Sequence, residues 1–283
     1  MTPDLLSVAV RALTFVALFQ AAGAAFFLAI LGHRLARARE PIRRLGWISA
    51  AVGTVLVFVH LWLDGARLSG DFDGLWDRDL QQLAWASKSG ISQIAQATGL
   101  LGVMVALWRT AQNRVGWASL GGVLAVGAFL LTGHTSAHAL RAVLAPLLAL
   151  HLFIVAFWFG SLIPLAVVLR VEDRETAADL LKRFSSVSAW LVPVILLAGI
   201  SMAWILASSL RVLGQPYGQL LMVKLAGFGL LMLLAAANKW RLARAFEQGS
   251  SDTALRRSFA VEWVLIVAIL SVTAVLTSFY SPD

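Results

Sequence analysis

Long apolar segments alternate with short polar connections along the whole chain. A membrane-spanning helix needs about 20 apolar residues, and eight segments meet that length: 5–32, 45–63, 89–108, 116–138, 143–169, 186–208, 218–240 and 259–279. The segments are continuous and rich in Leu and Ala, without the alternating pattern of membrane β-strands. The pattern therefore predicts an all-α fold, in which eight transmembrane helices form one domain over residues 1–283.

The composition agrees with a multi-pass membrane protein and leaves no room for a separate soluble domain. Of the 283 residues, 59% are hydrophobic and 13% are charged. The longest connection, 64–88, contains five aspartates and is long enough for only a short surface helix. The chain has no cysteine, which excludes disulfides and thiolate ligands. A soft metal ion would therefore have to be bound by His or Met.

Positive charges predict how the chain is oriented. The connections after the first, third, fifth and seventh segments contain 16 Lys and Arg residues, against five in the opposite connections. Positively charged connections stay in the cytoplasm, so both termini are expected in the periplasm of a bacterial inner-membrane protein. The first segment follows Asp4 and contains Arg11, which is unlike a cleaved signal peptide. The net charge of +8 thus reflects topology, and no nucleic-acid partner is expected.

Four of the five histidines are predicted at the same level of the membrane. At a rise of about 1.5 Å per residue, His60 lies about 22 Å from the inner start of its segment, and His134 and His151 about 27 Å. His134 and His138 share a helix face if their helix continues through both, whereas a break at Gly133 would place them on a surface turn. Polar residues in a membrane interior indicate function, so we predict a metal site formed by His60, His134, His138 and His151.

The residue types only partly identify the metal. Imidazole suits zinc, copper, iron and nickel alike, whereas the thioether of methionine favours Cu(I). Met202 and Met222 are predicted in the outer third of their segments and are candidate secondary ligands. Methionine also commonly fills gaps in protein cores, and a single interfacial histidine often serves only as an anchor. Both alternatives stay open at this stage.

Two charged residues fall within apolar segments. Lys224 lies about 9 Å from the outer end of its segment, where it either snorkels to the surface or gates a metal pathway. Glu262 lies about one turn inside the last segment, too far in height to pair with Lys224. It is expected either to form an ion pair with Arg256, Arg257 or Lys239, or to act as an inner exit group or a proton acceptor.

Four stretches resemble the copper-resistance protein D (CopD) family. They are LLTGHTSAH (130–138), LHLFIVAFWFGSLIPL (150–165), YGQLLMVKLAGFGLLMLLAAANKWRL (217–242) and LRRSFAVEWVLIVAIL (255–270). The resemblance implies an inner-membrane protein that moves copper between periplasm and cytoplasm, often beside a small periplasmic copper-binding protein. The positions that match the family motifs are Gly133, His134, His151, Trp158, Gly160, Lys224, Asn238 and Glu262.

Three functions are compatible with these features. The leading hypothesis is copper binding and transport without enzymatic activity, because no nucleophile triad, phosphate loop or carboxylate pair is evident. One alternative is a haem-b redox protein whose axial ligands are His60 with His151 or His134 with His151. The other is a scaffold that delivers copper without transporting it. The membrane lipid and copper itself are the expected partners in the leading case.

Overall fold

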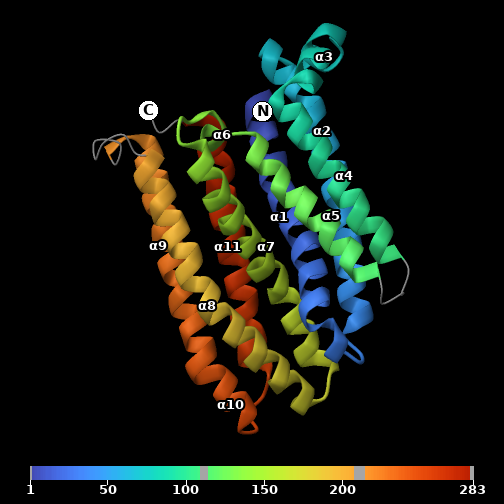
Figure 1. The fold of residues 1–283 in the computed structure, drawn as a ribbon, viewed down its shortest axis with the longest axis vertical. Coiled ribbons are helices and arrows are strands. Elements are labelled where there is room, and N and C mark those ends of the chain that lie inside the picture. Colours follow the sequence, from blue (N-terminus) through green and yellow to red (C-terminus); the bar gives the residue numbers. More distant parts are fainter. Residues whose placement is uncertain (1, 109–113, 207–213, 281–283) are drawn as a thin grey trace.

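The protein is described by a computed structural model that covers residues 2–108, 114–206 and 214–280. Every regular element in these ranges is helical (Figure 1), which confirms the predicted all-α class. The long helices are α1 (Pro3–Leu31), α2 (Arg39–Ser69), α4 (Lys88–Trp108), α7 (Arg141–Val171), α8 (Arg174–Leu206), α9 (Pro216–Ala237) and α11 (Thr253–Phe279). The shorter ones are η1 (Gly32–Arg34), η2 (Phe72–Leu75), α3 (Arg78–Ala86), α5 (Val115–Gly127), η4 (Ala128–Leu131), α6 (His134–Ala137), η6 (Asn238–Leu242) and α10 (Ala243–Glu247).

Seven helices within the described residues are long and apolar enough to cross a membrane. The fourth predicted segment is also helical, but α5 and η4 together span only Val115–Leu131. This helix ends before Gly133, whose φ of 82° lies in the left-handed region that favours glycine. The expectation of one helix through His134 and His138 is therefore wrong, and the alternative of a break at Gly133 is confirmed.

Helix α1 lies at the centre of the bundle and packs against α2, α5, α7 and α11. It crosses α7 where Gly23 meets Gly160, since a methyl group built on Gly160 would lie 2.5 Å from the Cα atom of Gly23. Small residues at such a crossing let two membrane helices approach closely. The side chain of Gln20 strengthens the contact: its Nε2 donates to the carbonyl of Gly160 (3.0 Å), and its Oε1 accepts from Trp263 Nε1 (3.3 Å).

The two ends of the bundle differ in what they carry (Figure 1). At the terminal end lie the start of α1, the end of α11, and the short helices α3 and α6; Arg11 donates to Ser278 there, over 3.3 Å. The basic end carries α10 and the connections between α1 and α2 and between α7 and α8. These two connections are joined by Glu172, whose Oε1 accepts the backbone N–H groups of Ala36, Arg37 and Ala38 at 2.8–2.9 Å.

Two helix boundaries differ from the prediction. Helix α2 continues to Ser69, so Asp64 belongs to the helix and not to the acidic connection. The connection that remains is shortened further by η2 and α3. Helix α3 corresponds to the short surface helix that was expected there. Helix α8 begins at Arg174, twelve residues before the predicted start of its apolar segment at 186. Its first turns are amphipathic and polar, which is why the apolar run did not include them.

Candidate functional site

His60 is buried in the terminal half of the bundle. Helix α2 places it one turn before Asp64, so both side chains lie on the same helix face. The imidazole is 7% exposed, and its Nε2 has no hydrogen-bond partner. The charged groups that act on it are Asp64, Arg11 and Arg67. A buried, unpartnered imidazole nitrogen is chemically able to bind a metal ion.

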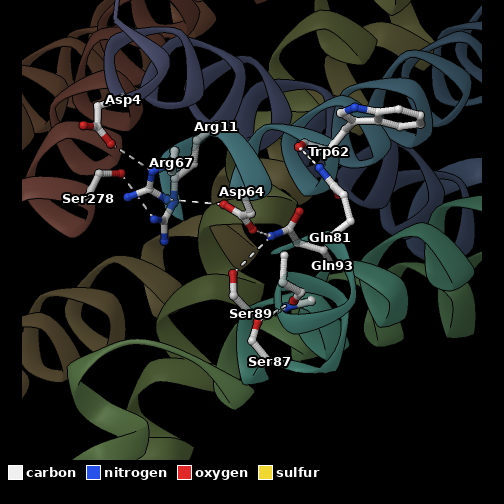
Figure 2. Close-up of polar contacts among 12 residues, drawn as sticks. Asp4, Arg11, Trp62, Asp64, Arg67, Gln81, Ser87, Ser89, Gln93 and Ser278 are labelled. Carbon is white, nitrogen blue, oxygen red and sulfur yellow. Dashed lines mark hydrogen bonds and ion pairs between the residues drawn. The ribbon is translucent and has the colours of Figure 1, made fainter. Parts of the chain in front are cut away.

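A polar network surrounds Asp64 (Figure 2). One carboxylate oxygen accepts from Gln93 Nε2 at 2.7 Å, and the other pairs with Arg67 at 3.4 Å. Arg67 also pairs with Asp4, over 3.1 Å. The Oε1 of Gln93 is buried and has no partner. Two arginines therefore face two aspartates, so a cation beside His60 would meet attraction and repulsion in similar measure.

His151 lies on α7 and faces a different set of neighbours. Its ring packs against α8 at Gly199, where an added Cβ atom would lie 3.7 Å from the histidine Cε1. Its Nδ1 is buried without a hydrogen-bond partner. The charged group that acts on it is Lys224 of α9. Lys224 is therefore near enough to act electrostatically on His151, and the sequence singled out the two residues by separate arguments.

The remaining candidate ligands are spread over the terminal end. His138 is half-buried and its Nδ1 accepts the backbone N–H of Leu140 at 3.0 Å, next to the start of α7. His134 begins α6, and its side chain lies outside what the structure describes. Met202 is 9% exposed on α8, whereas Met222 is 52% exposed on α9. Over the described residues, no three His, Asp or Glu side chains form a ready metal-binding group.

A cavity of about 540 Å³ opens between α7, α8, α9 and α11, nearer the basic end. Its walls are mostly apolar and include Val192 and Pro193 of α8. The side chains with polar atoms that line it are Trp158, Ser185, Ser188, Asn238, Lys239, Trp240 and Glu262. Trp158 was singled out in the sequence by the family motif, and Glu262 also as a candidate exit group or proton acceptor. Trp158 lies seven residues after His151 on α7, which is two turns, or about 10 Å, closer to the basic end.

Glu262 is the most deeply buried of the polar groups in this cavity, with 2% exposure. Its carboxylate accepts a hydrogen bond from the side-chain amide of Asn238 and lies within hydrogen-bonding reach of Trp158. Among the described residues no ion pair includes Glu262, and Arg256 pairs with Asp252 instead at 2.7 Å. The expected ion pair with a basic residue of the same end is therefore not formed.

A π-helical turn, η6, places Asn238 beside Glu262. It interrupts the α-helical course of α9 from Asn238 to Leu242 before α10 continues. Such turns occur frequently at functional sites, because the extra residue re-aims its neighbours. The periodicity of the sequence gave no sign of this turn. Only the Asn-Lys pair of the family motif drew attention to the position.

Comparison with known proteins identifies the family of the chain. The family model "Copper resistance protein D-like, N-terminal domain" matches residues 1–140, and "Copper resistance protein D" matches residues 178–276. The chain belongs to the copper-resistance protein D family. The first match covers α1 to α5 with the His60 network, and the second covers α9 and α11 with Asn238 and Glu262.

Two curated relatives carry names that refer to copper. Copper resistance protein D of Pseudomonas syringae pv. tomato is 28% identical over 96% of this chain and 95% of its own length. Copper transport protein CutJ of Bacillus subtilis (strain 168) is 31% identical over 57% of this chain, but the match spans only 29% of CutJ. No solved structure matches the chain. The protein is thus a multi-pass membrane protein of a copper-handling family.

Proposed function

We propose that this CopD-family protein binds copper in the terminal half of the bundle and transports it across the bacterial inner membrane, between periplasm and cytoplasm. The observation that carries the proposal is His151. Its Nδ1 is buried without a side-chain partner and lies against α8 near the backbone of Ile195, and Trp158 of the cavity lies about two helical turns further along α7. One relative is named for copper resistance and another for copper transport. Binding and translocation, without enzymatic turnover, account for these features.

The terminal end supplies the entry in this proposal. His134 and His138 receive copper from the periplasm, and a small periplasmic copper-binding protein is the partner that delivers it. His151 holds the ion deeper in the bundle, with Met202 as a thioether ligand close to Gly199 on α8, and His60 on α2 is a separate binding position. Binding must remain exchangeable, because a transported ion has to leave as well as enter. The positive charge of Lys224 beside His151 favours such weak binding.

Metal analysis of the purified protein tests the binding step. The wild type is expected to retain copper, and His151→Ala is expected to lose most of it. His33→Ala is a matched control, because His33 is exposed at the basic end, next to Arg34. Full stoichiometric copper in His151→Ala would contradict the assignment. An absorption spectrum of the same sample with a Soret band, and one haem per chain, would favour the haem-b alternative instead.

Transport itself requires a flux measurement. Protein reconstituted in liposomes, with a copper-sensitive chelator enclosed, is expected to move copper faster than empty liposomes. Loss of that flux in His151→Ala, but not in His33→Ala, would support the pathway. Copper that is bound and never moved would identify the protein as a delivery scaffold.

A further inference from the structure

The carboxyl group of Glu262 has an unusual environment for a membrane helix. It lies nine residues beyond the first residue of α11, about 14 Å along the helix axis. The amide of Asn238, which hydrogen-bonds to it, and the indole of Trp158, which lies within reach, are both neutral. An ionised carboxylate buried without a cation is costly, so such a group either binds a proton or serves a passing cation.

The cavity beside this carboxyl group is large enough to admit water. A volume of about 540 Å³ is ample for several water molecules, each of which occupies about 30 Å³ in the liquid. Lys239, Ala243 and Leu255 line its part closest to the basic end. Asn238 is 6% exposed, and its Oδ1 has no hydrogen-bond partner, so a second buried acceptor lies beside Glu262. Both features suit a site that is occupied by a proton or by another positive charge.

Among the described residues that line the cavity, Glu262 carries the only carboxyl group. From α7 the cavity receives the neutral Trp158, and from α8 the neutral hydroxyls of Ser185 and Ser188. The π-helical turn contributes Lys239, which is exposed. On α11 itself, Arg256 is already paired with Asp252. One carboxylate can neutralise one positive charge, so a proton on Glu262 and a copper ion close by oppose each other.

We propose that Glu262 is a proton-binding site coupled to copper: copper bound at His151 displaces a proton from Glu262 into the water of the cavity. The proposal rests on the copper-binding function proposed above. Copper binding shifts the carboxyl group from its neutral acid toward the carboxylate, and the proton that is given up leaves toward the basic end. When copper leaves, the carboxylate takes up a proton from the same water. Acidity on the basic side therefore promotes the release of copper.

The size of the coupling follows from distance. His151 lies about 10 Å along α7 from the level of Trp158, which touches Glu262. At an effective dielectric constant of about 20, two unit charges at that distance change each other's binding by about tenfold. Linkage is reciprocal. Protonation of Glu262 should therefore weaken copper binding, and bound copper should weaken proton binding by the same factor.

Copper titration of the full-length protein in detergent tests this proposal. Cu(I) is supplied from a competing chelator in a weakly buffered solution that contains a pH-indicator dye. The wild type is expected to release a proton as copper binds, and its copper affinity is expected to fall as the pH is lowered. Glu262→Gln should lose that proton release and show an affinity lower by up to about tenfold, with the full difference reached as the pH is raised. Glu175→Gln, an exposed position near the start of α8, should behave like the wild type.

The outcomes separate this proposal from the proposed function. If the wild type binds no copper, the copper function itself fails. If it binds copper through His151, but Glu262→Gln releases as many protons with the same pH profile, the coupling is overturned and the binding site remains. Should Glu262→Gln fail to fold, infrared difference spectra of the wild type decide. Loss of a protonated carboxyl band on copper addition supports the coupling, and an unchanged carboxyl region refutes it.

Discussion

At the scale of single residues, function depends on which neighbours a side chain faces and not only on its depth. His60 and His151 were both predicted in the outer third of the membrane. The structure places His60 among Asp64, Arg11 and Arg67, and His151 against α8 and Lys224. Depth follows from counting residues along a helix. The direction in which a side chain points depends on how its helix is rotated and packed. The apolar pattern of such segments hardly constrains that rotation.

The pairing of Asp64 gives a first prediction. Asp64→Asn should lower the free energy of unfolding by about 2 kcal/mol, because removing one partner leaves the charge of Arg67 and Arg11 less compensated. Thermal unfolding of the detergent-solubilised protein measures the change. Asp73→Asn, in the exposed turn after α2, is the control and should unfold like the wild type. Equal stability of the two variants would show that the network contributes nothing.

Close packing at Gly23 gives a second prediction. Gly23→Ala should destabilise the protein by about 1–3 kcal/mol, since the added methyl group forces α1 and α7 apart. Gly229→Ala is the matched control, because nothing lies within 4 Å of a Cβ atom built there. Both variants gain helix propensity from the same change. A Gly23→Ala protein as stable as the control would show that the two helices separate freely.

At the scale of elements, breaks in helices matter more than their regular parts. Gly133 ends the fourth apolar helix, and the π-helical turn of η6 presents Asn238 to Glu262. The sequence suggested Gly133 as a possible break, because glycine adopts positive φ without strain. A π-helical turn has no comparable residue signature, so only the structure reveals it, at the end of α9 where that helix packs against α11.

The contact between two connections at the basic end gives a third prediction. Glu172→Ala should lower stability by about 2 kcal/mol, because the backbone N–H groups of Ala36, Arg37 and Ala38 lose a charged acceptor and must turn to water. Glu175→Ala, three residues along, serves as the control. Unfolding midpoints in detergent compare the two, and an unchanged midpoint in Glu172→Ala would count against this contact.

At the scale of the whole molecule, the two ends have different roles in the proposed transport. The terminal end carries the candidate entry histidines, and the basic end carries most of the positive connections, with the cavity nearer to that end. The charge rule that orients membrane proteins predicts that the basic end faces the cytoplasm. Copper would then pass from the level of His151 to the level of Trp158 along one face of α7.

Cysteine labelling gives a fourth prediction, which the absence of native cysteines makes simple. Asp73→Cys, near the terminal end, should react with a membrane-impermeant maleimide on intact spheroplasts. Ser250→Cys, at the basic end after α10, should react only after the membrane is permeabilised. Both positions are exposed, so a difference in labelling reports the side of the membrane. The opposite pattern would reverse the proposed orientation.

The amino-acid sequence by itself determined the all-α class, the apolar segments and their order, because burial in a bilayer demands long continuous apolar helices. Motif resemblance also named Trp158, Asn238 and Glu262, although it did not show that they meet. Tertiary structure decided that these three residues share one cavity and that His60 and His151 have separate neighbours. Helices of similar composition can rotate about their axes at little cost in apolar burial, so close packing at small residues and the few buried polar contacts select the arrangement.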